Sequence, residues 1–174
     1  AESSPKSDWA TVASSSLSLA DYYMMQGSIV RARKLYKELW ESLSTDESGV
    51  LFRDEIFSRA VPLNDRPIPE FASEAGPSPL GGPSDEFLQG SVTVSFSVTD
   101  RGRVIEIEPV EVVPGEFTDM QKLVHREVRG RLYRPRFEDA EPVKTTDQVF
   151  THLFYYKQSD LEERREEAAG NADT

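Results

Sequence analysis

The stretch of residues 90–104, GSVTVSFSVTDRGRV, constrains the fold more than any other part of the sequence. Apolar side chains alternate with serine or threonine along its first half, at Val92, Val94, Phe96 and Val98. Such alternation places the apolar side chains on one face of a strand and the hydroxyl groups on the other. The tripeptide DRG, with Gly102 at a positive φ, then suits a tight loop. We therefore expect a hairpin whose strands cover residues 88–99 and 103–113.

The second strand of this hairpin changes phase along its length. Ile105 and Ile107 share one face, whereas Val110 and Val112 share the other. Because Pro109 lies at the switch and cannot donate a backbone hydrogen bond, the pattern predicts a bulge or a strand end there.

A helix and a third strand follow the hairpin. Within residues 115–132, Phe117, Met120, Val124 and Val128 form an apolar stripe at helical spacing. Thr118 and Gln121 have the spacing of an N-terminal capping box. Residues 147–156, DQVFTHLFYY, are rich in β-branched and aromatic types and predict a strand. The charged tail, residues 158–174, is expected to be either a frayed helix or disordered.

Two helices are expected near the N-terminus, after a flexible start at residues 1–8. Residues 9–27 form the first helix and residues 28–43 the second, with Ser28 as the N-cap of the second. The two helices should lie antiparallel, because Gly27 breaks the first helix and the second begins at once.

The segment between the helices and the hairpin falls into two parts. Residues 46–63 are ambiguous, and extended structure is favoured from Ile56 because Pro62 disfavours helix just before it. Residues 64–87 are rich in proline and glycine, which is typical of a semi-stiff linker. The sequence thus predicts a helical domain at 9–63, a linker, and a second domain at 88–157.

Composition limits the functions that the chain can have. The 174 residues carry a formal net charge of −11 and no cysteine. The negative charge argues against a positive field over the whole surface, as nucleic acid or an anionic membrane would require. No apolar run is long enough to span a bilayer, and disulfides and thiolate chemistry are excluded. His125 and His152 lack metal-ligand spacing, and no phosphate-binding loop or serine-nucleophile motif occurs. We therefore expect no enzyme, no metal and no cofactor.

The order strand, tight turn, strand, helix, strand over residues 88–157 resembles the C-terminal domain of TonB, the periplasmic module that energises outer-membrane transporters. The matching residues are Gly90, Val92, Val94, Phe96, Val98, Gly102, Val104, the Arg134-Pro135 pair, the Pro142-Val143 pair and the aromatic last strand. The flank before the first strand keeps little of the family's usual aromatic-proline segment, and Ala140 stands where a glycine is usual. The resemblance implies an α+β fold with a ββαβ domain and a three-stranded antiparallel sheet. It also implies a periplasmic location, either free or held by an inner-membrane anchor outside these residues.

The N-terminal helix pair resembles a tetratricopeptide repeat. The residues at the spacing of that repeat's packing positions are Leu19, Ala20, Tyr23, Gly27, Ala32 and Tyr36. A plain helical hairpin explains the same residues, so both interpretations stay open. Because solenoid units usually need about three repeats to bury a continuous core, a lone pair should pack against the sheet or another chain.

The last strand is the leading candidate for partner binding. The resemblance to TonB implies recognition of an extended peptide, and an open sheet edge is a template for an added strand. The residues assigned to this edge are Gln148, Val149, Thr151, His152, Leu153 and Tyr155. Phe150, Phe154 and Tyr156 are instead expected to fill the core under the helix.

A basic series is the second candidate. It comprises Lys122, Arg126, Arg129, Arg131, Arg134 and Arg136. This series could contact an acidic partner or an anionic glycan. The favoured alternative is a solvated helix face that balances nearby acids, with Arg134 held by the fold.

The function implied by the resemblance is a periplasmic protein-binding module. Its partner would be a TonB-dependent outer-membrane transporter or another envelope protein, with a homodimer as a further alternative. The competing interpretation is a periplasmic scaffold or adaptor that is not coupled to the proton motive force.

Overall fold

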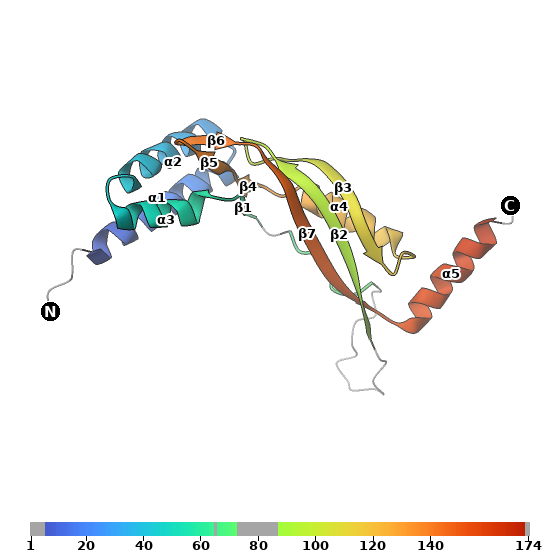
Figure 1. The fold of residues 1–174 in the computed structure, drawn as a ribbon. Helices are drawn as coiled ribbons and strands as arrows, with labels where there is room; N and C mark the ends of the chain where they lie inside the picture. Colours follow the sequence, from blue (N-terminus) through green and yellow to red (C-terminus); the bar gives the residue numbers. More distant parts are fainter. Residues whose placement is uncertain (1–5, 65, 73–86, 173–174) are drawn as a thin grey trace. The chain divides into compact units, whose positions relative to one another are not determined.

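The chain has an α+β fold in which helices precede the strands, as the sequence predicts. A computed structural model describes residues 6–64, 66–72 and 87–172 (Figure 1). These residues form two compact units. The helical unit contains residues 6–64, 97–105 and 131–146, and the sheet unit contains residues 66–72, 87–96, 106–130 and 147–172. This division differs from the boundaries expected from the sequence, because residues 97–105 and 131–146 belong with the helices.

Three helices begin the helical unit: α1 (Lys6–Met25), α2 (Ile29–Leu43) and α3 (Glu47–Phe57). The turn between α1 and α2 matches the sequence interpretation, since Gly27 has a φ of 75° and Ser28 takes the N-cap position. The Ser28 side chain itself makes no capping hydrogen bond. Of the flexible start expected at residues 1–8, residues 6–8 belong to α1 and residues 1–5 lie outside the described residues.

The expectation of extended chain from Ile56 is wrong, because α3 continues through Phe57. Both residues are buried in the core of the helical unit, so packing favours continued helix there. Pro62 restricts only the residue directly before it, which leaves the last turn of α3 unaffected. The start of α3 is capped by Asp46, whose Oδ1 accepts a hydrogen bond of 2.8 Å from the Gly49 N–H.

Four short strands complete the helical unit. They are β1 (Val61–Pro62), which pairs antiparallel with β4 (Tyr133–Arg134), and β5 (Arg136–Glu138), which pairs antiparallel with β6 (Glu141–Val143). Between β5 and β6, Asp139 and Ala140 have φ values of 47° and 65°. Positive φ at both central residues is the geometry of a type I′ turn, so Ala140 adopts a conformation that glycine favours.

Aromatic rings from distant parts of the chain form the core of the helical unit. Tyr36 and Phe57 are fully buried. The ring of Phe137, from β5, lies 5.3 Å from that of Tyr36 and 4.8 Å from that of Phe57. The helix pair therefore packs against α3 and β5 of its own chain.

The sheet unit is built on a three-stranded antiparallel sheet with the order β3–β2–β7. Its strands are β2 (Leu88–Val98), β3 (Val104–Val113) and β7 (Thr145–Tyr156), with residues 97–98, 104–105 and 145–146 counted in the helical unit. The hairpin strands match the sequence prediction to within one residue, and Gly102 has the expected positive φ, 74°. β7 begins two residues earlier than predicted.

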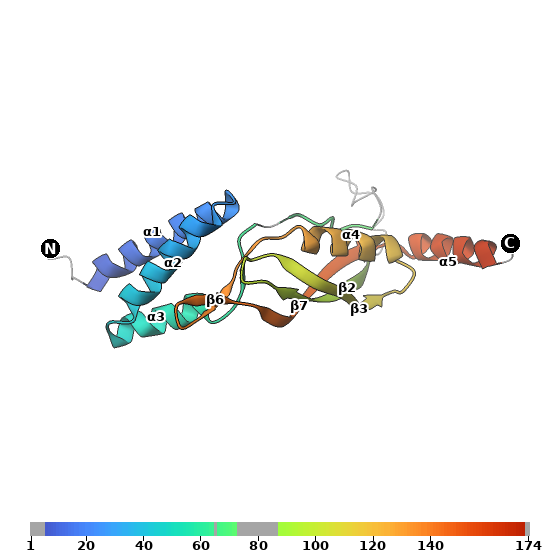
Figure 2. The same cartoon turned by 90° about the horizontal axis from the view of Figure 1, so that it is seen from above.

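The predicted faces of the first hairpin strand and of the helix are confirmed. The buried hydrophobic residues of β2 are Val92, Val94, Phe96 and Val98, and Gly90 and Ser97 are buried as well. Helix α4 (Thr118–Arg129) lies along one face of the sheet (Figure 1, Figure 2). The buried residues of its segment are Phe117, Met120, Val124 and Val128.

Two local expectations in the sheet unit are corrected, and for the tail the helical alternative is confirmed. β3 continues through Pro109, and the backbone irregularity lies instead at Glu106, whose φ is 53°. An edge strand tolerates proline, because one side of its backbone is outside the ladder. The N-cap of α4 is the fully buried Phe117 rather than Thr118, and no side chain caps this helix, so the capping box is wrong. The charged tail forms helix α5 (Gln158–Ala172), whose Leu161 is buried.

Candidate partner-binding edge

The two faces of β7 differ sharply in exposure. Phe154 and Tyr156 are buried, as the sequence predicts for the face under α4, whereas Phe150 on the same face is only half-buried. On the other face, Val149 is 64% exposed, Leu153 51% and Tyr155 37%. The strand therefore has one face in the core and one apolar face in contact with solvent.

The buried face of β7 is fixed by ring packing. The ring of Phe117 lies 5.1 Å from that of Phe154 and 4.9 Å from that of Tyr156. Gly90 of β2 allows this arrangement, because a Cβ at that position would collide with the ring of Phe154. These contacts hold the face and register of β7, and so they set which backbone groups point to its outer edge.

The outer edge of β7 is occupied in part by the chain itself. Phe71 forms a parallel bridge with Tyr155. The Tyr155 N–H donates to the Glu70 carbonyl at 2.6 Å, and the Ala72 N–H donates to the Tyr155 carbonyl at 2.9 Å. Nε2 of His152 lies 2.9 Å from the Pro69 carbonyl oxygen. Residues 69–72 therefore lie where an added strand would lie.

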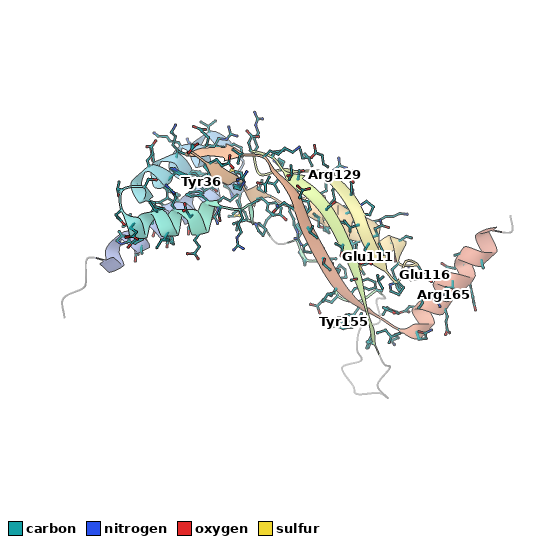
Figure 3. The ribbon with its side chains drawn as sticks, viewed as in Figure 1. Tyr36, Glu111, Glu116, Arg129, Tyr155 and Arg165 are labelled. Carbon is teal, nitrogen blue, oxygen red and sulfur yellow. The ribbon has the colours of Figure 1, made fainter. Side chains whose placement is uncertain are left out.

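Side-chain contacts support this short pairing. The ring of Phe71 lies 5.7 Å from that of Tyr155 and 5.2 Å from that of Phe87. Further along the segment, Nη1 of Arg66 lies 3.6 Å from a carboxylate oxygen of Glu127 in α4. Figure 3 labels Tyr155 at this edge.

Sequence reasoning missed this pairing, because residues 64–87 were interpreted as a linker. Residues 66–72 lie in the sheet unit, whereas residues 65 and 73–86 are outside the described residues. The available signal was the aromatic residue Phe71 beside the prolines at 67 and 69. An aromatic side chain in such a segment often marks a docking contact.

The six residues assigned to the partner-binding edge lie on both faces of β7. Those on the exposed face are Val149, Thr151, Leu153 and Tyr155, and those on the half-buried face are Gln148 and His152. Thr151 Oγ1 lies 2.9 Å from Thr93 Oγ1 of β2, which ties the exposed faces of the two strands together. Among the described residues, no backbone hydrogen bond joins Thr151 or Leu153 to a segment outside the sheet.

The basic series does not form one surface. Lys122, Arg126 and Arg129 are exposed on α4, in the sheet unit. Arg131 and Arg134 are 8% and 6% exposed and belong to the helical unit. In the same unit, Arg136 is half-buried and pairs with Glu138. The series can offer at most the three α4 side chains as a continuous positive face.

Arg134 belongs to a polar network inside the helical unit. Its Nη1 lies 3.3 Å from Oδ2 of Asp21, and the Tyr36 hydroxyl donates to Oδ1 of Asp21 at 2.6 Å. Burial raises the pKa of Asp21, while the Tyr36 hydrogen bond and the charge of Arg134 act in the opposite direction. Burial and the neighbouring carboxylate also raise the pKa of Tyr36, so its hydroxyl remains a donor. The network therefore holds β4 against the helices and leaves Arg134 unavailable to a partner.

Charged pairs also fix α5 to the start of α4. Both Nη atoms of Arg164 bind the Asp119 carboxylate, at 2.6 and 2.9 Å, and its guanidinium lies 4.4 Å from the centroid of the Phe117 ring. Nε of Arg165 donates to Glu116 at 2.7 Å, and this hydrogen bond lowers the pKa of Glu116 (Figure 3). The tail thus docks on the sheet unit.

The two histidines have different surroundings. His125 lines a cavity of about 460 Å³ together with Val94, Pro109, Gln121 and Lys122, whereas His152 contacts the Pro69 carbonyl. Within the described residues, no group of three or more histidine, aspartate or glutamate side chains could hold a metal ion. In the same part of the chain, no helix is both long and apolar enough to cross a bilayer.

Comparisons with known proteins add no assignment. No protein-family model matches the chain, and no curated protein matches its sequence.

Proposed function

We propose that this protein is a periplasmic partner-binding module with a TonB-like ββαβ domain, which binds an extended segment of an envelope protein at the outer edge of β7. The partner is a TonB-dependent outer-membrane transporter. The helix pair before this domain is tetratricopeptide-like.

One observation carries the proposal: the outer edge of β7 accepts a strand. Tyr155 already pairs through both of its backbone groups with residues 70 and 72. Backbone groups of alternate residues in a strand point to the same edge, so those of Leu153 and Thr151 share the edge of Tyr155. An extended partner could continue the ladder along these residues and contact the exposed side chains of Val149 and Leu153.

The experiment compares two substitutions at Thr151 and follows binding of a synthetic peptide. The peptide corresponds to the periplasmic N-terminal segment of a TonB-dependent transporter, and binding is followed by backbone amide shifts. Thr151→Pro removes a donor from the edge and should abolish binding. Thr151→Ala keeps the donor and should weaken binding by less than about threefold, since it removes only the side chain.

Two checks make the result decisive. Each variant must first give the circular dichroism spectrum of the unmodified chain. Peptide-induced shifts confined to Lys122, Arg126 and Arg129, with the amides of β7 unmoved, would refute edge binding and favour an electrostatic contact on α4.

A second candidate, a scaffold or adaptor, is supported by a groove in the helical unit. A cavity of about 560 Å³ lies among the three helices, with Trp9, Val12, Leu35 and Leu39 among its apolar lining residues and Glu38 and Asp46 among its acidic ones. Val12 is 63% exposed, so Val12→Asp should leave the fold intact while blocking an apolar ligand of this groove. If Val12→Asp removes binding to an envelope partner and Thr151→Pro does not, the scaffold function replaces edge binding.

A further inference from the structure

The segment at residues 69–72 forms a very short ladder on β7. Among the described residues, its backbone makes two hydrogen bonds with the backbone of β7, both with Tyr155. The Pro69 carbonyl also contacts Nε2 of His152. Because the backbone groups of Glu70 and Ala72 face β7, the next donor toward Leu153 is the Glu70 N–H, and it makes no hydrogen bond to β7 among these residues.

The same segment is poorly buried. Pro67, Pro69 and Glu70 are exposed, whereas Phe71 and Ala72 are half-buried. Its contacts with other side chains include the Phe71 ring on Tyr155 and Phe87, the His152 ring on the Pro69 carbonyl, and the ion pair of Arg66 with Glu127. The Arg66 side chain is 50% exposed, and an ion pair of that kind contributes little to stability. These contacts position the segment without holding it strongly.

A partner strand that pairs along the edge from Thr151 to Tyr155 needs the backbone groups that residues 70 and 72 occupy. Each backbone N–H of a strand has one strong acceptor at a time. The chain's own segment and a partner therefore cannot both pair with Tyr155.

We propose that residues 66–72 are an internal competitor that covers the partner-binding edge of β7 and is displaced when a partner strand pairs there. This inference rests on the proposed edge-binding function. The tethered segment lowers the population of the open edge, and the apparent affinity for a partner falls by the same factor. Displacement is favoured because a partner segment that pairs with Thr151, Leu153 and Tyr155 forms a longer ladder than the one at Tyr155.

The test weakens the pairing of residues 69–72 with β7 and then measures how well the outer edge of β7 is protected and how tightly it binds a peptide. Ala72→Pro removes the N–H that donates to the Tyr155 carbonyl. The matched control is Glu70→Pro, which adds a proline to the same segment where, among the described residues, no N–H bond to β7 is found. Phe71→Ala is a second variant that removes the ring contact with Tyr155 and keeps the backbone donors.

The first measurement is hydrogen exchange of the Tyr155 amide in the full chain. We expect exchange about tenfold faster in Ala72→Pro than in the unmodified chain, because a hydrogen bond of the pair is lost. If the Tyr155 amide is equally protected in the unmodified chain, Ala72→Pro and Phe71→Ala, the segment does not cover this edge and the inference is wrong.

The second measurement uses two peptides in trans. One has the sequence of residues 66–72, and the other is the transporter peptide used for Thr151. The tethered segment has an effective concentration in the millimolar range. The 66–72 peptide should therefore shift the β7 amides in Ala72→Pro at about millimolar concentration and leave the unmodified chain unchanged. The transporter peptide should bind Ala72→Pro about tenfold more tightly than the unmodified chain.

The outcomes separate the two proposals. If the transporter peptide binds the unmodified chain and Ala72→Pro equally while Tyr155 exchange rises, edge binding stands and internal competition is overturned. If the transporter peptide binds neither protein but the 66–72 peptide binds Ala72→Pro alone, internal occupancy stands and the proposed function fails. If Glu70→Pro accelerates exchange of the Tyr155 amide, internal competition requires that this variant also binds the transporter peptide more tightly. Faster exchange with unchanged affinity for the peptide would overturn the proposed internal competition.

Discussion

The helical unit and the sheet unit complete their cores with residues at different distances along the sequence. In the helical unit, Phe137 packs on Tyr36 and Phe57, which precede it by about half of the chain's length. In the sheet unit, β2 and α4 each bury a face with a simple period in the sequence, and Phe117 packs on Phe154 and Tyr156. The two units also differ in the burial of their ion pairs. The pair of Asp21 and Arg134 lies largely inside the helical unit, whereas Arg164 and Arg165 of the sheet unit make their pairs nearer to solvent.

This difference shows which interactions a periodic pattern can reveal. A period of two or of 3.6 residues determines which face of an element is buried, but not what covers it. The sheet unit is covered by α4, whose buried side chains recur at helical spacing in the sequence. The helical unit is covered by a hairpin of two three-residue strands, which is too short to show any period.

The largest expected effect is the loss of a buried ring. Phe137→Ala should lower the free energy of unfolding of the helical unit by about 3–5 kcal/mol, the usual range for a buried phenylalanine. Both tryptophans of the chain, Trp9 and Trp40, lie in that unit, so their fluorescence in urea reports on it. Phe96→Ala should cost a similar amount in the sheet unit, measured by hydrogen exchange of the β2 amides.

The exposed Val149 provides the control for both substitutions. Val149→Ala should change either measurement by less than about 0.5 kcal/mol. A loss below about 1 kcal/mol for Phe137→Ala would show that the helices close their core without β5. The same small loss for Phe96→Ala would place the opposite face of β2 in the core.

The α+β class, the hairpin, α4 and the last strand could be predicted, because each has a strong local signal in the sequence. The β5–β6 hairpin and the pairing of residues 69–72 could not. Phe137 stands alone in a charged stretch, and its partners are decided by tertiary packing. The candidate edge followed from the length and apolar character of β7, but among the described residues the segment that covers part of it makes two backbone–backbone hydrogen bonds, both with one residue. For the basic series, the favoured interpretation holds, because Arg134 is buried beside Asp21 in the fold. Sequence spacing does not show that the series is divided between the two units.

A second comparison removes a charge from each unit. Arg134→Met should destabilise the chain by about 3 kcal/mol at pH 7, because it leaves the Asp21 carboxylate buried without its cation. The folded-state pKa of Asp21 is already raised, and removing Arg134 raises it further. Because the pKa of Asp21 is raised in the folded state, the contribution of this group to stability is greatest below its unfolded-state pKa of 3.8. That contribution is lost as the pH rises through the folded-state pKa. The destabilisation should therefore shrink as the pH falls from 7 toward 4.

Urea melts of Arg134→Met across this pH range provide the measurement. Arg126→Met is the matched control, since the Arg126 side chain is 70% exposed, and it should cost less than about 0.5 kcal/mol at every pH. An Arg134→Met effect that stays constant between pH 7 and pH 4 would show that Arg134 does not lower the pKa of Asp21.

The corresponding pair in the sheet unit should give a smaller effect that is lost at a lower pH. Burial raises the pKa of Asp119, but the hydrogen bonds and charge of Arg164 outweigh it, so the pKa lies below 3.8. Because the pKa of Asp119 is lowered in the folded state, its contribution to stability is present above the unfolded-state pKa. That contribution is lost as the pH falls through the folded-state pKa. Arg164→Met should cost about 1 kcal/mol at most, because the Asp119 side chain is 57% exposed and solvent screens the pair.

Melts of Arg164→Met should therefore show a nearly constant cost from pH 7 to pH 5 and a falling cost below pH 3.8. The contrast with Arg134→Met is sharpest near pH 4, where the helical-unit effect has already shrunk. If Arg164→Met loses its cost in the same pH range as Arg134→Met, the two units do not differ in the burial of their ion pairs.

The smallest expected effect concerns the turn that closes the helical unit. Ala140 has a φ of 65°, and a residue with a Cβ in that region costs roughly 1–2 kcal/mol. Ala140→Gly removes this cost, but glycine also gains about 0.4–1 kcal/mol of conformational entropy in the unfolded chain. The net result should be a stabilisation of about 0.5 kcal/mol, measured by the tryptophan fluorescence melt of the helical unit. The control is Ala168→Gly on the exposed surface of α5, which should destabilise this helix by about 1 kcal/mol, measured by hydrogen exchange of its amides, because helical glycine is unfavourable. Destabilisation by Ala140→Gly would mean that the backbone of Ala140 is not in the left-handed region. The β5–β6 turn next to Phe137 would then have a different geometry.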